Sequence, residues 1–299
     1  MTWWARRIAF WPRARVCCYQ GLRIRRRFPC STANSWRMTF QQVARRLWPA
    51  VERQITNPVR DPARGGKPRI ADELVFYKLV MFLRAGCSWD TFDELCRGSG
   101  VSGRTCRRRF AQWRDDGVFE RVCDALRPGL DTAQIAHLDA MFVRSRGGGD
   151  DLVGLTRHGK GSKIQTMVNE RSEPLLFQLT SANPNESSIT SNLIEDEDDL
   201  PRIVVADKAY DYDFLRDEFA ERSSTLVSPH RSGRAKPPRD QRHVGRHYKN
   251  RWIVERFFAW LAAWRRLAVR WEQRADHYWQ WLCLGISLIY TRRGIGHAF

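Results

Sequence analysis

From about residue 70 to residue 126, hydrophobic and polar positions alternate with the three-to-four spacing of amphipathic helices. The pattern predicts four helices: Ile70 to Gly86, Trp89 to Cys96, Gly103 to about Trp113, and Val118 to Leu126. Ser88 and Ser102 directly precede the second and third helices, where a side-chain hydroxyl caps the free backbone N–H groups of the first turn. Two short helices joined by a glycine turn, the second of them very basic, are typical of a helix-turn-helix.

After Pro128 the hydrophobic period changes, and short apolar runs alternate with helical segments. The apolar runs predict five strands, at residues 135–143, 163–168, 174–180, 203–206 and 225–228. The helical segments lie at residues 187–194, 211–221, 245–266 and 275–292. Three strands in series, followed by alternating helices and strands, predict a mixed α/β (α+β) domain with a five-stranded mixed sheet and flanking helices.

The chain therefore divides into three parts. Residues 67–130 form an all-α domain, and residues 131–299 form the α/β domain. Residues 1–66 are expected to be a basic, disordered extension, ending in a Pro/Gly-rich linker at residues 60–68. Two interpretations of this extension stay open, a contact with DNA backbone or no role at all. A start codon near Met38 would explain why the leader lacks acidic residues.

The net charge of the chain limits the class of molecule that it is expected to bind. Its 299 residues contain 51 Lys and Arg against 33 Asp and Glu, a net charge of +18, and residues 1–51 contain no acidic residue. So basic a chain favours a polyanionic partner, either nucleic acid or an anionic membrane. The longest apolar run, residues 279–290, is shorter than the roughly 20 residues that span a bilayer. We therefore expect no membrane insertion.

The eight cysteines contain no Cys-x-x-Cys pair, which argues against a zinc ribbon or a thioredoxin-like site. Several fall in amphipathic stretches and are interpreted as small core residues. Reduced thiols of this kind indicate a cytoplasmic protein.

Four arginines crowd the third predicted helix, and no acidic residue stands among them. They are Arg104, Arg107, Arg108 and Arg109. A solvated charged helix is one interpretation, and DNA contact is the favoured one. Lys160 and Lys163 belong to a second basic stretch, beside the first strand of the sheet, that is also expected to line DNA.

Three acidic residues stand where catalysis would require them. Asp139 interrupts an apolar strand, Asp207 ends another, and Glu255 lies on the long helix 245–266. An ionised carboxylate in apolar surroundings is costly unless it is paired or bound to metal. Taken singly, Asp207 could cap a helix and Glu255 could pair with Arg251 one turn earlier. As a set, carboxylate oxygens suit Mg²⁺ or Mn²⁺.

The motifs around these acids resemble those of DDE-class bacterial insertion-sequence transposases of group five. The similar segments are Leu138–Arg144, Gly159–Lys163, Ala206–Asp211 and Tyr248-x2-Arg251-x3-Glu255-Arg256. The resemblance covers roughly residues 69–292. It implies a ribonuclease-H-like core in which Asp139, Asp207 and Glu255 hold two Mg²⁺ or Mn²⁺ ions. It also implies that Tyr248 and Arg251 grip the DNA backbone near the cut, with Arg256 as an adjacent basic group.

The function implied by the resemblance is metal-dependent cleavage and strand transfer of double-stranded DNA at the terminal inverted repeats of an insertion sequence. A homodimer bridging two transposon ends, at the nucleoid in the bacterial cytoplasm, is the expected form. Ala209 stands where the family usually has Gly, and Ala262 where related groups have a basic residue. A catalytically inactive DNA-binding protein from a decayed transposase is therefore an alternative, as is a host nuclease without strand transfer.

Overall fold

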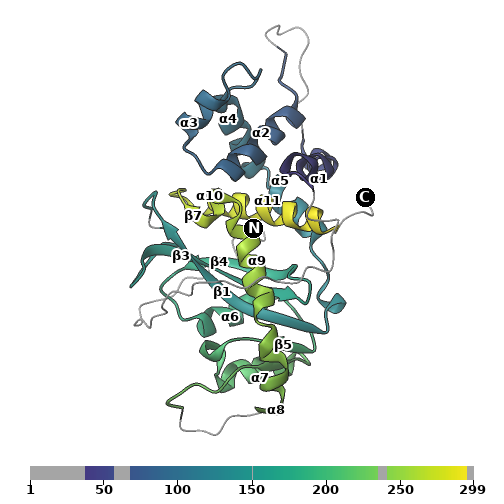
Figure 1. Ribbon diagram of the computed structural model, residues 1–299, viewed down its shortest axis with the longest axis vertical. Helices are drawn as coiled ribbons and strands as arrows, with labels where there is room; N and C mark the ends of the chain where they lie inside the picture. The colour runs from purple at the N-terminus through teal and green to yellow at the C-terminus, as the bar shows by residue number, and fades with distance from the viewer. Residues whose placement is uncertain (1–37, 57–67, 150, 235–240, 295–299) are drawn as a thin grey trace. The chain divides into compact units, whose positions relative to one another are not determined.

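The computed structural model describes residues 38–56, 68–149, 151–234 and 241–294 (Figure 1). It separates into two compact units. The described residues 127–260 and 269–275 form one unit, which is built on a β-sheet. The helical unit contains the described residues up to 126, together with residues 261–268 and those from 276 onward. Two segments from the C-terminal part of the chain thus fold with the N-terminal helices, although the sequence grouped residues 131–299 together.

The helical unit is assembled from short amphipathic helices. Their bounds are α1 Phe40–Gln54, α2 Asp72–Ala85, α3 Trp89–Leu95, α4 Gly103–Asp115, α5 Val118–Leu126, α10 Arg265–Ala268 and α11 Ala275–Arg293. Ser88 and Ser102 cap α3 and α4 as predicted, because each hydroxyl accepts a hydrogen bond from a backbone N–H three residues on. None of the described helices is both long and apolar enough to cross a bilayer.

Helix α1 corrects the expectation that residues 1–66 lack structure. Thr39 and Gln42 form a capping box at its start, and its apolar face, with Val43 and Leu47, is buried. A Thr-x-x-Gln signature before an apolar period was therefore present in the sequence. The remainder of this extension, residues 1–37 and 57–66, lies outside the described residues. Both interpretations of its role concern those residues, and they stay predictions, as does the proposed start near Met38.

An aromatic core explains why α11 belongs to the helical unit. Trp281 of α11 stacks on Phe110 of α4 with 3.9 Å between ring centroids, and it lies 5.6 Å from Phe82 of α2. Phe82 in turn stacks on Trp89 at 4.0 Å. Large buried rings contribute much of the packing energy of a small core. Cys96, Cys106, Cys123 and Cys283 are buried and unpaired, in agreement with the predicted role of the cysteines as core residues.

The second unit is built on a mixed β-sheet. Its strands are β1 Ile135–Ser145, β2 Gly154–Thr156, β3 Gly159–Asn169, β4 Pro174–Ser181, β5 Ile203–Val205, β6 Thr225–Val227 and β7 Val269–Arg270. Strand β1 is central, antiparallel to β3 and parallel to β5, while β4 continues beyond β3 and β6 beyond β5. The five predicted strands are present. Within the described residues the sheet has two more, β2 and β7, which are too short for a hydrophobic period to reveal.

Helices α6 Glu186–Ile194 and α7 Asp213–Glu221 belong to this unit, as do α8 Gln241–His247 and α9 Trp252–Ala262 up to Trp260 (Figure 1). Leu138 of β1, Met167 of β3, Leu193 of α6 and Phe219 of α7 share one buried core. The single helix predicted for residues 245–266 is wrong. A 3₁₀ turn at Tyr248–Asn250 separates α8 from α9, and a second break precedes α10.

Candidate active site

Strand register brings Asp139 and Asp207 to the same edge of the site. In the parallel pair of β1 and β5, His137 lies opposite Val205. Asp139 and Asp207 each follow two residues later, so Asp207, just beyond the end of β5, comes level with Asp139 in the middle of β1. The carboxyl end of a parallel strand is where functional groups of α/β folds gather, and here it is the end of β5.

Asp207 is held by the turn that follows β5. It is only 8% exposed, and its Oδ1 accepts a hydrogen bond from the backbone N–H of Ala209 at 2.7 Å. The turn is the short 3₁₀ helix Lys208–Tyr210. Ala209 is not among the described residues with positive φ. An alanine is therefore unstrained where the family usually has glycine, and this reason for suspecting a decayed protein falls away.

Arg251 lies against Asp139. Its Nη2 donates to Oδ2 of Asp139 at 2.8 Å, and its Nη1 donates to the hydroxyl of Tyr248 at 3.1 Å. The backbone N–H of Ala140 donates to the other carboxylate oxygen of Asp139 at 2.8 Å. Tyr248, Arg251 and Asp139, drawn from two distant sequence motifs, thus form one connected group.

The electrostatics of the site are those of crowded negative charge. The pKa of Asp139 is raised to about 7, chiefly by burial; Arg251 opposes the shift, and Asp207 and Glu186 add to it. Burial by itself would lower the pKa of Arg251, but Asp139 and Tyr248 raise it above its ordinary value. The guanidinium therefore stays charged and balances the carboxylates.

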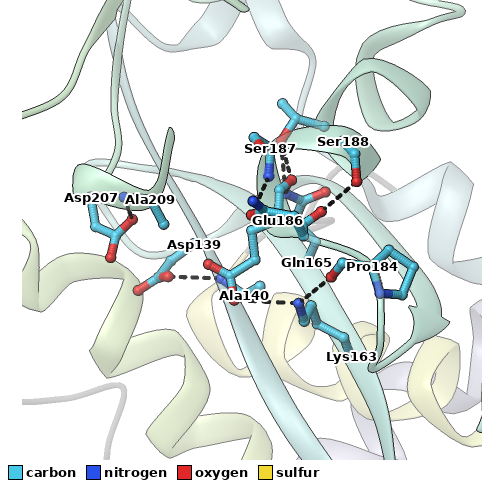
Figure 2. A network of polar contacts seen from close by, with 12 residues as sticks. Asp139, Ala140, Lys163, Gln165, Pro184, Glu186, Ser187, Ser188, Asp207 and Ala209 are labelled. Atoms are coloured by element: carbon cyan, nitrogen blue, oxygen red, sulfur yellow. Dashed lines mark hydrogen bonds and ion pairs between the residues drawn. The ribbon is translucent and has the colours of Figure 1, made fainter. Parts of the chain in front are cut away.

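Glu186 is an acidic residue that the sequence analysis did not single out. It begins α6, and Figure 2 shows its side chain and that of Asp139 directed toward one another, with Asp207 beside them. Burial raises the pKa of Glu186, Lys163 opposes that shift, and Asp207 adds to it. A Glu in the first turn of a helix ordinarily complements the helix dipole, so nothing local in the sequence marked it.

Glu255 is not part of this group. It is exposed on α9, one turn after Arg251, and makes no hydrogen bond or ion pair with any residue that the structure describes. Within the same described ranges, no three acidic, cysteine or histidine side chains stand close enough to enclose one metal ion. Folding thus brings two of the three predicted carboxylates together, and Glu186 rather than Glu255 lies beside them.

The chemistry of the donors nonetheless fits a divalent cation. Asp139, Asp207 and Glu186 offer hard oxygen atoms of the kind that Mg²⁺ and Mn²⁺ prefer. The guanidinium of Arg251 occupies the place of a cation on Asp139.

The predicted DNA-contacting arginines of α4 divide into two groups. Arg104, Arg107 and Arg108 are exposed, whereas Arg109 is 4% exposed and forms an ion pair with Asp72 of α2. Burial, reinforced by the nearby charge of Arg69, lowers the pKa of Arg109 to about 10. Arg109 was predicted to contact DNA with the other three, but its side chain is buried, because its position on the helix turns inward, toward Trp113.

The basic residues predicted beside the sheet also differ in their surroundings. Lys160 is exposed on β3, but Lys163 donates to the backbone carbonyl of Pro184 at 2.9 Å and pairs with Glu186 at 3.5 Å. Lys163 is therefore a counter-charge within the site rather than an outward-facing group. Arg256 lies over the rings of Trp252 and Trp260, at 4.6 and 5.3 Å. It also donates to Ser172 Oγ at 2.7 Å.

Asp211 belongs to the same motif as Asp207 but has a structural role, because it forms buried ion pairs. Its carboxylate is fully buried and pairs with Arg216 and Arg234, both at 2.6 Å. Burial would raise the pKa of Asp211, but hydrogen bonds from Arg216 and the backbone of Arg231 bring it below the ordinary value. Asp211 thus anchors the basic loop after β6 and leaves Asp207 as the acid of this motif that faces the site.

Residues 132–290 match the family described as the transposase DDE domain, and the chain belongs to this family. Residues 43–123 match a second family, described as a putative transposase of the IS4/5 family. The first match contains Asp139, Asp207 and Arg251, and the second contains most of the helical unit.

One similar protein is the putative transposase for insertion sequence element IS402 of Burkholderia cepacia, with 33% identity over 139 residues. The match covers 43% of this chain and 62% of that relative, so it extends over less than two thirds of the relative's length. A cryo-EM structure of the piggyBac transposase synaptic complex with hairpin DNA is similar in fold, with a TM-score of 0.53 and 11% identity. That likeness covers 84% of this chain and 71% of the other.

Proposed function

We propose that this protein is a transposase that binds the terminal inverted repeats of an insertion sequence and catalyses metal-dependent DNA cleavage and strand transfer. The observation that carries the proposal is the placement of Asp139 and Asp207 at one edge of parallel strands β1 and β5, in a chain that belongs to the DDE family. The net charge of +18 suits a DNA substrate.

The sheet supports a ribonuclease-H-like core for this chemistry. The five strands that the sequence predicted pair in the order β4-β3-β1-β5-β6. The pairing is antiparallel on one side of β1 and parallel on the other. In such a core the first acid lies on the central strand and the second follows the adjacent parallel strand. Asp139 and Asp207 occupy those two positions.

The helical unit supplies the proposed DNA-binding part. Helices α3 and α4 are joined by a turn containing Gly98 and Gly100, both with positive φ, which suits a helix-turn-helix. Arg104, Arg107 and Arg108 are exposed on the second helix and would contact the phosphates or bases of a transposon end. Lys160 would add a contact from β3.

By resemblance to the family, Asp139, Asp207 and Glu255 would hold two Mg²⁺ or Mn²⁺ ions, and Glu255, which is exposed and apart from the two aspartates, would have to move toward them. When bound, such cations would activate a water molecule or the 3′-hydroxyl of a DNA end as the nucleophile and would neutralise charge on the leaving oxygen. Tyr248 and Arg251 would orient the scissile phosphate, since the guanidinium and the phenol already share a hydrogen bond. Arg256, next to Glu255, would add positive charge along the DNA path.

The test is cleavage of a labelled transposon-end duplex by the full chain in the presence of Mg²⁺. The parent should nick at the end of the repeat, and Asp139→Asn or Asp207→Asn should abolish nicking while DNA binding persists. If both variants cut as well as the parent, the proposed active site is wrong. A joining assay with target DNA separates a transposase from a nuclease, because only the transposase produces strand-transfer products.

A homodimer on DNA is the proposed working form, because two transposon ends must be brought together for strand transfer. The structure of similar fold is a synaptic complex with DNA. Light scattering of the full chain with an end duplex should give the mass of two protein chains and two duplexes. A mass of one chain on one duplex at all concentrations would contradict this form.

A further inference from the structure

The turn between β3 and β4 presents a buried serine to the start of α9. Ser172 is fully buried, and its Oγ donates a hydrogen bond to the backbone carbonyl of Ile253 at 2.5 Å. The same Oγ accepts a hydrogen bond from Nε of Arg256 at 2.7 Å. One hydroxyl thus uses both its donor and its acceptor on residues that are 81 and 84 positions away in the sequence.

The backbone of Ser172 has a conformation that suits glycine better than serine. Its φ is 64°, in the left-handed region, where a Cβ atom is strained. The turn holds it there, because the N–H of Ser172 donates to the carbonyl of Asn169 at 2.9 Å and the Asn169 side chain accepts from the N–H of Glu173 at 3.0 Å. Glycine would adopt this φ without strain but would supply no hydroxyl. Strained residues of this kind gather at functional positions, where the surroundings maintain them.

Arg256 is fixed on the other side of this contact. Its guanidinium lies 4.6 Å from the ring centre of Trp252 and 5.3 Å from that of Trp260, and its Nη2 donates to the carbonyl of Glu170 at 3.4 Å. Stacking on the two rings orients the planar guanidinium, and its Nε donates to Ser172. The side chain of Arg256 therefore joins α9 to the β3–β4 turn.

This contact lies next to the residue that reaches Asp139. Arg251 directly precedes α9, two positions before Ile253, and donates to Asp139 at 2.8 Å. Asp139 is on β1, which pairs with β3, the strand that leads into the turn of Ser172. Ser172 therefore fixes α9 on the same pair of strands that carries Asp139. Precise placement matters here, since a shift of about 1 Å near reacting groups can lower a rate roughly a hundredfold.

We propose that Ser172 is a positioning residue, whose hydroxyl docks the first turns of α9 through Ile253 and Arg256 and thereby sets the place of Arg251 beside Asp139. The inference rests on the DNA cleavage proposed above and deepens it, because Arg251 is the proposed contact of the scissile phosphate. Ser172 acts through α9 and has no contact with DNA in this proposal.

The test is single-turnover cleavage of the end duplex by the full chain at saturating DNA concentration. Ser172→Ala should lower the cleavage rate about tenfold or more, while the Kd for DNA changes less than about twofold, because α9 is displaced but the DNA-contacting side chains remain. A cleavage rate equal to that of the parent would overturn the proposal.

The matched control is Ser224→Ala. The side chain of Ser224 is also buried in the sheet unit, and its hydroxyl donates to the backbone carbonyl of Pro201 at 2.6 Å. This variant should lose a comparable amount of stability and cut at the rate of the parent. If Ser224→Ala and Ser172→Ala cut equally slowly, the role of Ser172 is structural only and the proposal is wrong.

Ser172→Gly separates the hydroxyl from the backbone strain. Glycine relieves the strain of a positive φ, so this variant should unfold at a higher urea concentration than Ser172→Ala and yet cut as slowly. A merely structural role would make the cleavage rate follow stability. Recovery of the parent's rate by Ser172→Gly would therefore contradict the positioning role.

Arg256→Lys tests the other side of the contact. Lysine keeps the positive charge but lacks the Nε–H that Arg256 donates to Ser172. Because Ser172→Ala and Arg256→Lys break the same contact, the double variant should cut within about threefold of the slower single variant. Effects on the rate that multiply fully would show that the two side chains act separately, against the proposal.

Hydrogen exchange of α9 without DNA distinguishes failure of this inference from failure of the proposed function. The backbone N–H groups of α9 should exchange faster in Ser172→Ala than in the parent or in Ser224→Ala. If they do so although the parent cuts no end duplex, the proposed function fails and the docking of α9 by Ser172 stands. Parent-like exchange in Ser172→Ala would reject the docking, whether or not the parent cuts DNA.

Discussion

Arg251 donates a hydrogen bond to Asp139 at 2.8 Å, although the two residues are 112 positions apart in the chain. The guanidinium therefore already provides positive charge at one carboxylate oxygen of Asp139. The same guanidinium is the proposed contact for a DNA phosphate. Binding of a divalent ion and release of Arg251 toward DNA are thus expected to favour one another.

Arg251→Gln should have opposite effects on metal binding and on cleavage. Removing a positive charge beside Asp139 should tighten Mn²⁺ binding without DNA by up to about tenfold, or 1.4 kcal/mol. Cleavage of the end duplex should fall, because the phosphate loses its charged partner. Arg246→Gln, an exposed arginine of α8, serves as the control. Weaker Mn²⁺ binding by Arg251→Gln would show that the guanidinium supports the metal site.

The raised pKa of Asp139 makes stability depend on pH. Between the ordinary value of about 3.9 and the folded value of about 7, the folded chain holds a proton that the unfolded chain has lost. Unfolding free energy contributed by this group therefore decreases as pH rises through that window, by up to about 1.4 kcal/mol per pH unit.

Asp139→Asn should remove this slope. In urea denaturation without divalent metal, the stability of the variant relative to the parent should increase steadily from pH 4.5 to pH 7.5. Asp131→Asn, at an exposed position, should show no such trend. A parent-to-variant difference that stays constant over this range would contradict the shift.

The pKa of His137 is shifted downward, whereas that of Asp139 is shifted upward. It is 1% exposed, and neither ring nitrogen has a hydrogen-bond partner among the described residues. Burial, together with the charges of His247 and Arg251, lowers its pKa to about 4. The unfolded chain therefore binds the extra proton between about pH 4 and the ordinary value near 6.5, and stability contributed by His137 is lost as pH falls through this window.

His137→Leu should consequently stabilise the protein, and more so at pH 5 than at pH 8. Removing an unsatisfied buried polar ring should contribute about 1–3 kcal/mol at either pH. The measurement is urea denaturation at the two pH values, with metal chelated. Equal or lower stability of the variant at pH 5 would indicate that His137 has a polar partner in solution.

Arg109 and Arg108 should behave differently despite being neighbours. Arg109→Ala should cost about 1–3 kcal/mol, because it removes a buried side chain and one of the two arginines that pair with Asp72, the other being Arg69. Arg108→Ala should leave stability within about 0.5 kcal/mol, yet weaken binding to the end duplex and reduce the salt slope by about one. Melting curves and salt-dependent binding of both variants check this, and equal losses of DNA affinity at unchanged stability would refute it.

Local sequence signals predicted most of the elements of this protein. The helices capped by Ser88 and Ser102 begin where the hydroxyls indicate, because capping needs only three consecutive residues beyond the cap. The strands that carry or precede Asp139 and Asp207 were visible as apolar runs interrupted or ended by an acid. Helix α1 was not predicted, although its capping box at Thr39 is a local signal, because the surrounding stretch is rich in arginine.

The sequence by itself therefore determined most of the succession of elements and singled out the two aspartates, since these depend on backbone propensity and on the cost of an acid in an apolar strand. Only the tertiary structure decided that Arg109 and Lys163 face inward, that Trp281 packs on Phe110, and that Glu186 rather than Glu255 stands beside Asp139. Such relationships join side chains distant in sequence. Their energies depend on packing and on the local dielectric, which no short window of sequence contains.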